Sequence, residues 1–295
     1  MAKHCDGRVV IITGAGGGLG EAHAKVLASE GAKVIVNDVN ESAALKVVEQ
    51  ISTEGGQAVA NTSDITSYDE SFNVVEQALQ TFDDLHCVVN NAGINRDRMF
   101  ASMTEDDWDM IISVHLKGHF CISSHAVRYW RGKSKGGAEI NARIINTSSG
   151  AGLQGSIGQS NYAAAKAGIA ALTLNQAAEL SRYGITANTI VPAARTGMTT
   201  AVAEMAERMK KPEDGSFDYW APENVSPVVA YLASIDSKHI TGKAFEIEGG
   251  RLSICDGWRS TAPIDKGDRW DIDELALHIG QLIDSSEPAQ KVWGT

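Results

Sequence analysis

Short runs of β-branched and aliphatic residues alternate with longer amphipathic segments along most of the chain, and this alternation constrains the fold most. Apolar strands separated by helices predict an α/β, Rossmann-like fold: a doubly wound, seven-stranded parallel sheet with helices on both faces. The predicted strands are Arg8–Thr13, Lys33–Asn37, Gln57–Asn61, His86–Asn90, Arg143–Ser148, Thr186–Val191 and Ala244–Glu248.

The pattern predicts a single catalytic domain over residues 1–250, followed by a C-terminal extension over residues 251–295. Two long helices are predicted within the domain, over Glu105–Tyr129 and Asn161–Arg182, and the polar segment Arg131–Asn141 is expected to be an exposed loop.

The extension is rich in charge and tryptophan, and Asp273–Ile283 could form a short amphipathic helix. Trp258, Trp270 and Trp293 need a surface to pack against. The extension could pack on the domain itself, on a partner subunit or over the mouth of a substrate site.

Composition excludes several classes of function. The net charge of -11 argues against a nucleic-acid surface, which needs clustered basic residues. None of the 4 cysteines lies near another in the sequence, so no metal-binding CxxC pair exists, and we expect no metal. No apolar run is long enough to span a bilayer, and no signal segment opens the chain, so a cytoplasmic protein without a membrane partner is expected.

A glycine-rich turn follows the first predicted strand and leads into a helix. Its sequence is TGAGGGLG, with Gly14, Gly18, Leu19 and Gly20 at the key places. Glycines allow close approach of the backbone to a pyrophosphate, and the first N–H groups of a helix point at such an anion. A flexible loop is the alternative, but the strand–turn–helix context favours a dinucleotide cradle.

Asp38 ends the second predicted strand and favours NAD as the cofactor. A carboxylate at this position accepts hydrogen bonds from the ribose hydroxyls of the adenosine and repels a 2′-phosphate. A helix cap or a turn residue is the alternative role for this side chain.

A tyrosine and a lysine stand four residues apart on one predicted helix, at Tyr162 and Lys166. They therefore share a face. A nearby ammonium favours the phenolate and lowers the pKa of a tyrosine, which makes the tyrosine a usable acid and base near neutral pH. Such a pair also occurs by chance on surfaces. Here Ser149 lies shortly before it, just past the fifth predicted strand.

These motifs together resemble the short-chain dehydrogenase/reductase family. The resemblance implies a catalytic set of Ser149, Tyr162 and Lys166, with His115 where many members carry an asparagine that completes a proton relay. A packing histidine is the alternative for His115. The resemblance implies that the cofactor is bound by Gly14, Gly18, Leu19, Gly20, Asp38, Asp64, Ile65, Asn91, Ala92, Gly93, Tyr162, Lys166, Pro192, Thr196 and Met198, whereas Asn90 braces the sheet.

Two departures from the family pattern indicate which branch of the family this sequence resembles. They are His115 itself and the segment Pro192–Met198, which lacks a second glycine. With the sequence around them, they resemble the (3R)-hydroxyacyl-CoA dehydrogenase unit of type-2 peroxisomal multifunctional enzymes, also called 17β-hydroxysteroid dehydrogenase type 4, and its free-standing actinobacterial relatives. This resemblance implies NAD-dependent oxidation of a 3-hydroxyacyl-CoA, with a fatty or steroid acyl group, to the 3-ketoacyl-CoA.

Three alternatives stay open: a dehydrogenase of free 17β-hydroxysteroids, a 3-ketoacyl-carrier-protein reductase, and a non-catalytic protein that senses NAD(H). For the leading hypothesis a lid is expected at about residues 195–222, and family members form homodimers or homotetramers. Candidate partners for the CoA phosphates are the basic residues Arg96, Arg98, Arg195, Lys210 and Lys211. Ordinary solvated charges are the alternative, and this alternative is favoured for Lys210 and Lys211. Candidate acyl contacts in or beside the lid are the apolar residues Met205, Met209, Phe217, Tyr219 and Trp220, which would suit the core equally well.

Overall fold

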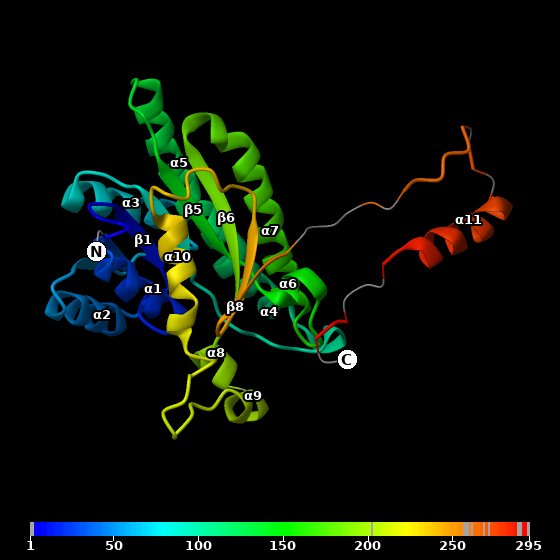
Figure 1. Cartoon of the computed structure of the whole chain (residues 1–295), viewed down its shortest axis with the longest axis horizontal. Helices are drawn as coiled ribbons and strands as arrows, with labels where there is room; N and C mark the ends of the chain where they lie inside the picture. The colour runs from blue at the N-terminus through cyan, green and yellow to red at the C-terminus, as the bar shows by residue number, and fades with distance from the viewer. Residues whose placement is uncertain are drawn as a thin grey trace.

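The fold is built on one sheet with helices on both faces (Figure 1). The structure is a computed structural model, and it describes residues 3–201, 203–255, 260, 262–267, 269–270, 272–287 and 291–293. In this part of the chain the sheet has eight strands in the order β3-β2-β1-β4-β5-β6-β7-β8. The strands are β1 (Val9–Thr13), β2 (Lys33–Asn37), β3 (Gln57–Asn61), β4 (Cys87–Asn90), β5 (Ala142–Thr147), β6 (Ile185–Ala193), β7 (Ala244–Glu248) and β8 (Arg251–Cys255).

The seven predicted strands are confirmed, and they pair in parallel from β3 to β7. The eighth, β8, was not predicted. It turns back through Gly249 and Gly250 and pairs with β7 in antiparallel register. A tight turn makes that pairing possible, whereas a parallel neighbour needs a long crossover.

Helices connect the strands and follow the predicted alternation. They are α1 (Gly18–Ser29), α2 (Glu41–Thr53), α3 (Tyr68–Phe82), α4 (Glu105–Ile111), α5 (Gly118–Lys135), α6 (Gly150–Gln154), α7 (Ser160–Leu180), α8 (Gly197–Thr200), α9 (Ala203–Arg208), α10 (Ser226–Ala233) and α11 (Ile272–Ser285).

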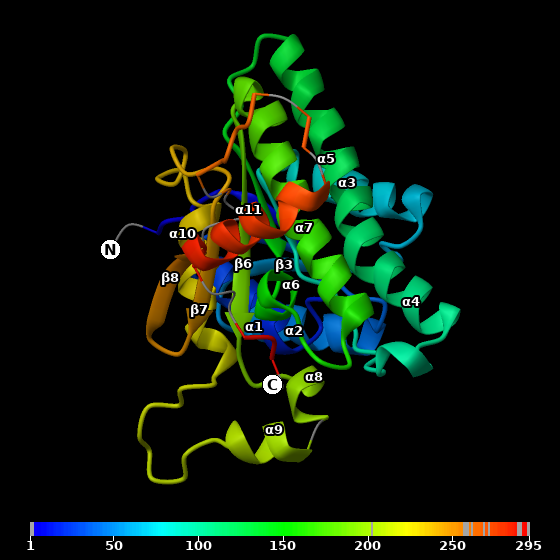
Figure 2. The same cartoon turned by 90° about the vertical axis from the view of Figure 1, so that its right-hand side faces the viewer.

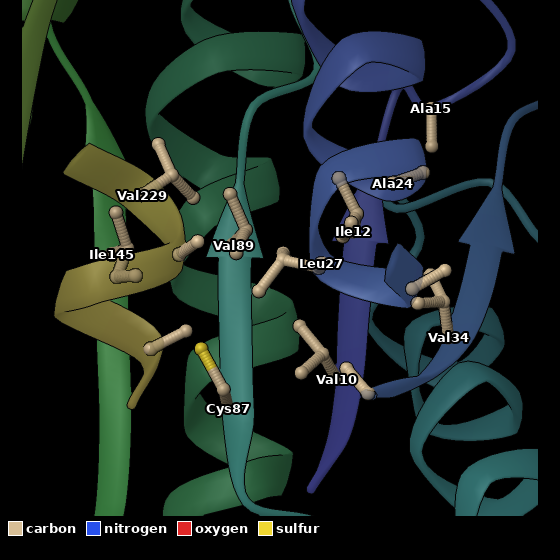
Figure 3. Close-up of a cluster of buried hydrophobic side chains, with 14 of the residues drawn as sticks. Val10, Ile12, Ala15, Ala24, Leu27, Val34, Cys87, Val89, Ile145 and Val229 are labelled. Atoms are coloured by element: carbon tan, nitrogen blue, oxygen red, sulfur yellow. The ribbon is translucent and has the colours of Figure 1, made fainter. Parts of the chain in front are cut away.

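Two apolar clusters lie on opposite faces of the sheet, because successive side chains of a strand point to opposite sides. In β1, Val10 and Ile12 belong to the cluster under α1, α2 and α10, shown in Figure 3. Val9 and Ile11 belong to the cluster under α3, α5 and α7. Burial on both faces explains why the strands read as continuous apolar runs.

The long helix predicted over Glu105–Tyr129 is interrupted. It consists of α4, a π-helical turn over Ile112–Lys117, and α5. The exposed loop predicted over Arg131–Asn141 was wrong in its first half, because α5 continues to Lys135. Basic residues stabilise the last turn of a helix, and Lys133 is also tied to Asp84 by a 2.7 Å ion pair.

The C-terminal extension contains the predicted amphipathic helix, α11, which lies apart from the sheet and its helices (Figure 1). Leu277, Ile279 and Ile283 are exposed on it. The chain then returns to the domain, where Trp293 pairs with Ser156. Of the three tryptophans singled out in the sequence, Trp258 lies outside the described residues.

Among the described residues, no helix is both long enough and apolar enough to cross a membrane.

Candidate active site

The glycine-rich turn joins β1 to α1 at the carboxyl end of the parallel strands. Gly14 has a φ of 62°, and a Cβ there would lie 2.7 Å from the Cα of Ala92. A Cβ at Gly20 would lie 2.1 Å from the carbonyl oxygen of Gly14. Larger residues at either position would force the turn apart, so the sequence pattern is a requirement of this tight backbone.

The N-terminus of α1 is open to a ligand. Its N-cap residue is Gly17, and no side chain caps the first turn. By contrast, side chains cap α2 through Asn40 and α3 through Ser67. A Cβ added at Gly17 would meet nothing within 4 Å. Uncapped N–H groups beside open space suit a phosphate, because the N-terminal end of a helix carries partial positive charge.

Asp38 lies at the end of β2, beside this turn. One of its carboxylate oxygens accepts a hydrogen bond from the backbone N–H of Gly16 at 2.9 Å, and the other accepts one from Asn40 at 2.9 Å. The side chain is only partly buried. The structure therefore holds a carboxylate at the rim of the cradle, where the sequence placed a partner for ribose hydroxyls.

The segment after β4 is fastened to the same turn. The backbone N–H groups of Asn91 and Ala92 donate to the hydroxyl of Thr13 at 3.0 and 3.1 Å. The Asn91 amide group donates to the carbonyl oxygens of Thr13 and Gly14. Asn90 is buried and donates to Ser123 and Asn146 across the sheet, so its predicted bracing role agrees with these contacts.

Two other predicted cofactor contacts differ from each other in accessibility. Asp64 is partly exposed and accepts a hydrogen bond from the backbone N–H of Thr66 at 2.8 Å. Ile65 is buried in the apolar cluster on the α3 side, and Gly118 is so close that a Cβ there would lie 2.8 Å from its side chain. Only the backbone of Ile65 is therefore available to a ligand.

Ser149, Tyr162 and Lys166 are brought together beyond the end of β5. Ser149 is the N-cap of α6, and its hydroxyl accepts from the N–H of Ala151 at 3.2 Å. Tyr162 and Lys166 lie one turn apart on α7, with the lysine Nζ 5.5 Å from the centre of the tyrosine ring. Helix α6 packs tightly on α7, since a Cβ at Gly152 would lie 2.6 Å from the Lys166 backbone.

Lys166 is buried, and its Nζ donates to the carbonyl oxygen of Thr147 at 2.7 Å. Burial lowers the pKa of Lys166 to about 7. Burial also raises the pKa of Tyr162, which the hydrogen bond with Ser149 lowers in part and Asp97 raises further. Desolvation of the phenolate outweighs the hydrogen bond with Ser149, so the pKa of Tyr162 is not lowered as the sequence argument expected from Lys166.

His115 lies in the π-helical turn, and its ring meets the ring of Tyr162 edge-on at 5.2 Å between centroids. Its Nε2 lies 2.8 Å from the carbonyl oxygen of Ile94 and 3.1 Å from the backbone nitrogen of Ile94. Its Nδ1 is buried without a hydrogen-bond partner. Burial lowers the pKa of His115 to about 3, so the ring is neutral at physiological pH.

Gly93 makes room for this histidine, since a Cβ at Gly93 would lie 2.4 Å from the His115 ring. The π-helical turn places the ring between Gly93 and Tyr162. Such turns recur at functional sites because one extra residue per turn shifts a side chain out of the regular helix register.

The segment after β6 closes the site from the other side. Pro192 is the penultimate residue of β6 and pairs with Ile247. Thr196 reaches the glycine turn, because a Cβ at Gly18 would lie 3.4 Å from its side chain. The carbonyl oxygen of Met198 accepts from the side chain of Asn95 at 3.5 Å.

The predicted lid contains α8 and α9, which project beyond the carboxyl end of the sheet (Figure 2). Arg195 anchors its base through a two-pronged ion pair with Asp218 and a 2.8 Å hydrogen bond to the carbonyl oxygen of Met209. Tyr219 packs against Gly249, where a Cβ would lie 2.4 Å from the ring. Met209 is buried and Phe217 is exposed. The apolar residues proposed as acyl contacts therefore differ in their exposure to solvent.

The basic residues proposed for CoA phosphates are mostly engaged elsewhere. Arg96 pairs with Asp106 at 2.7 Å, and Arg98 lies 3.5 Å from Asp107. Arg195 is held by Asp218. Because these carboxylates already neutralise the guanidinium groups, a phosphate would have to displace them. Arg195 also ties the base of the lid together, through Asp218 and the carbonyl oxygen of Met209.

Sequence reasoning gave no separate role to Asn161 and left the packing surface of Trp293 open, and both residues shape this site. Asn161 is fully buried, and its amide group donates to the carbonyl oxygens of Arg96 and Asp107 while its oxygen accepts from the N–H of Tyr162. It therefore fixes the start of α7 just before the tyrosine. Trp293 lies beside Gly150, the neighbour of Ser149. A buried asparagine directly before the tyrosine was a readable signal, whereas nothing local predicted the return of the tail.

The family model for short chain dehydrogenases matches residues 8–208, which include the glycine turn, Ser149, Tyr162 and Lys166. The chain belongs to the short-chain dehydrogenase family. It is therefore an oxidoreductase that acts on CH–OH groups, as the dehydrogenase names of its relatives also support.

Several relatives of this short-chain dehydrogenase are similar over most of its length. The hydroxyacyl-CoA dehydrogenase ChsB1 of Mycobacterium tuberculosis is 40% identical over 98% of this chain and 92% of its own. The peroxisomal multifunctional enzyme type 2 of Mus musculus is 41% identical over 86% of this chain, which spans only 32% of that enzyme. A crystal structure of a short chain dehydrogenase from Mycobacterium avium superposes with a TM-score of 0.90 at 48% identity, covering 99% of this chain and 100% of that one.

Proposed function

We propose that this short-chain dehydrogenase uses NAD to oxidise a 3-hydroxyacyl-CoA, with a fatty or steroid acyl group, to the 3-ketoacyl-CoA. The observation that carries the proposal is the convergence of Ser149, Tyr162 and Lys166 beside the glycine cradle. The substrate class is supported by relatives named as hydroxyacyl-CoA dehydrogenases and multifunctional enzymes.

The cradle fits a dinucleotide on three observations. The first turn of α1 lacks a side-chain cap, a Cβ at Gly17 would meet open space, and Asp38 stands at the rim. In the proposal, Gly14, Gly18, Leu19 and Gly20 enclose the pyrophosphate. Asp38 selects NAD because its charge repels the extra phosphate of NADP.

The other proposed cofactor contacts surround this cradle. Asp64 and the backbone of Ile65 would contact the adenine, and the segment Asn91–Gly93 would contact the cofactor along its length. Pro192, Thr196 and Met198 border the nicotinamide side, with Thr196 already next to Gly18.

The proposed chemistry divides the work among three side chains. The bound nicotinamide supplies the acceptor of the hydride. Tyr162 takes the hydroxyl proton of the substrate, and Ser149 holds the substrate oxygen by a hydrogen bond. Lys166, whose pKa burial lowers to about 7, holds the nicotinamide ribose and stabilises the phenolate as charge develops on Tyr162.

His115 takes a proton-relay role in this proposal. It stands edge-on to Tyr162 and keeps an unpartnered buried Nδ1, which is a polar atom available to a water molecule near the lysine. Since its pKa lies far below neutrality, it would act as a neutral hydrogen-bonding group and not as an acid.

The domain boundaries, the oligomeric state and the cellular compartment are also proposals. The proposed catalytic domain covers residues 1–250 and the proposed extension residues 251–295, although β8 (Arg251–Cys255) already belongs to the sheet; the rest of the extension would pack on the domain or on a partner subunit. Helices α5 and α7 would pair in a homodimer or homotetramer. The four cysteines, none of which lies near another in the sequence, suit a reducing cytoplasm.

Two assays test the proposal. Consumption of NADH is followed with a 3-ketoacyl-CoA and with a free 17-ketosteroid, and each is repeated with NADPH. We expect turnover of the thioester with NADH and at least tenfold slower turnover with NADPH. Turnover of the free steroid alone would favour the hydroxysteroid alternative, and a preference for NADPH would favour the carrier-protein reductase. Binding of NADH without turnover of any ketone would favour a cofactor-sensing protein.

A further inference from the structure

Three segments that are distant in sequence lie side by side at the active site. The backbone N–H of Arg98 donates to the carbonyl oxygen of Gly158 at 2.8 Å, and the N–H of Ile157 donates to the carbonyl oxygen of Trp293 at 2.9 Å. The N–H of Trp293 in turn donates to the carbonyl oxygen of Gly155 at 3.2 Å. The loop 155–159 is therefore bordered by the segment after β4 on one side and by the tail on the other.

This arrangement adjoins the catalytic side chains directly. Gly150 follows Ser149, and a Cβ there would lie 3.4 Å from the indole Nε1 of Trp293. A Cβ at Gly155 would lie 3.4 Å from the side chain of Val292. Because both positions are glycines, the side chains of Val292 and Trp293 can pack closely against this segment. At its other end the loop leads straight into α7 and Tyr162.

These segments expose five large apolar side chains, beside the exposed charged residues Asp97, Arg98 and Lys291. Met99 is 61% exposed, Phe100 76%, Ile157 48%, Val292 39% and Trp293 44%. We call these five residues the ledge. Scattered exposed apolar residues are ordinary, but apolar residues gathered from three segments beside catalytic groups are typical of a binding surface.

We propose that the ledge receives the apolar end of the substrate's acyl group and that Trp293 sets the preference for acyl-chain length. The five ledge residues are themselves uncharged and apolar, so they suit hydrocarbon that extends beyond the reacting carbon. This inference rests on the proposed function, because it assigns the acyl group of that substrate to these residues.

Chain-length dependence tests the inference. Turnover of 3-ketobutyryl-CoA and of 3-ketododecanoyl-CoA is compared for the wild type, Trp293→Ala and Trp293→Phe, with Leu252→Ala as a control at an exposed apolar residue of β8. For the twelve-carbon substrate we expect Trp293→Ala to lower kcat/KM about tenfold, mostly through KM, which matches the loss of about two buried methylene groups. The four-carbon substrate should change less than twofold, and Trp293→Phe should restore most of the loss.

Other outcomes would overturn the inference. An equal loss for both substrates would mean that Trp293 only supports the catalytic loop, and no loss for either would remove it from the substrate path. A change in sedimentation with unchanged kinetics would mean that another copy of the chain covers the ledge.

The result also separates this inference from the proposed function. If the wild type reduces a free steroid and neither thioester, the proposed function fails. The ledge then stands as a binding surface only if Trp293→Ala raises KM for that steroid, and it fails if KM is unchanged.

Discussion

The two halves of the candidate active site are built differently. The cofactor half, around the glycine turn, consists of buried parallel strands whose ends are joined by backbone contacts and hydrogen bonds to Thr13. The substrate half consists of loops, short helices and the tail, and it exposes large apolar side chains. In the cofactor half, close backbone contacts leave no room for a side chain larger than that of glycine at Gly14 and Gly20 of the turn. The substrate half is held by a few ion pairs and hydrogen bonds. Binding of cofactor and selection of substrate can therefore be altered independently.

The sharpest test of this comparison is Tyr162→Phe, at the boundary between the halves. Loss of the proton-transferring hydroxyl should lower kcat about a thousandfold, within the range for general acid–base catalysis. NADH binding, measured by fluorescence titration, should stay within threefold because the cradle is untouched. Turnover within tenfold of the wild type would contradict the assigned role.

The cofactor half is tested next by Asp38→Asn. Loss of the carboxylate should weaken NADH binding about tenfold, which corresponds to one charge-assisted hydrogen bond of about 1.5 kcal/mol. Calorimetric titration measures the change, with Asp69→Asn on α3 as the matched control. Unchanged NADH affinity together with unchanged discrimination against NADPH would show that Asp38 only orders the turn.

The substrate half is tested by Asp218→Asn, which breaks the ion pair at the base of the lid. A partly exposed pair of this kind contributes on the order of 1 kcal/mol, so we expect KM for the 3-ketoacyl-CoA to rise about fivefold. The dissociation constant of NADH should not change. Equal changes in both quantities would contradict the independence of the two halves.

The last test concerns the stability of the protein without its cofactor. Burial lowers the pKa of Lys166 to about 7, whereas an unfolded lysine titrates near 10.5. The unfolded state therefore binds more protons between these values, and this lysine makes stability rise as pH increases from about 7 to about 10.5. Below pH 7 its destabilising contribution is constant.

Lys166→Met should remove this dependence. We expect its melting temperature, relative to that of the wild type, to be highest at pH 7 and to fall by a few degrees toward pH 10. The difference between the two proteins isolates the lysine from Cys5 and Cys87, whose thiol pKa values burial raises. A difference that does not vary with pH would contradict the assignment.

The sequence predicted most of what depends on local pattern. Alternating apolar strands and helices indicated the parallel sheet, and the seven predicted strands are present. The glycine turn could be placed because its residues meet a steric requirement visible within eight positions. Tyr162 and Lys166 could be placed on one helix face because the helical period relates them.

The sequence did not predict what depends on contacts between distant segments. The polar end of α5 was read as a loop because its composition resembles one, although Asp84 partners Lys133 there. Arg195 was assigned to phosphates because its carboxylate partner, Asp218, comes from the far side of the lid. The pairing of Trp293 with Ser156 has no local signal, since it needs the sheet, α6 and the tail to be in place.

The seating of the tail has a practical consequence for how the protein is handled. Because the backbone of Trp293 is bonded to the loop that leads into α7, any peptide fused after it emerges beside the catalytic serine. A C-terminal purification tag would therefore crowd the entrance for long acyl chains, and a tag at the other terminus would leave it clear.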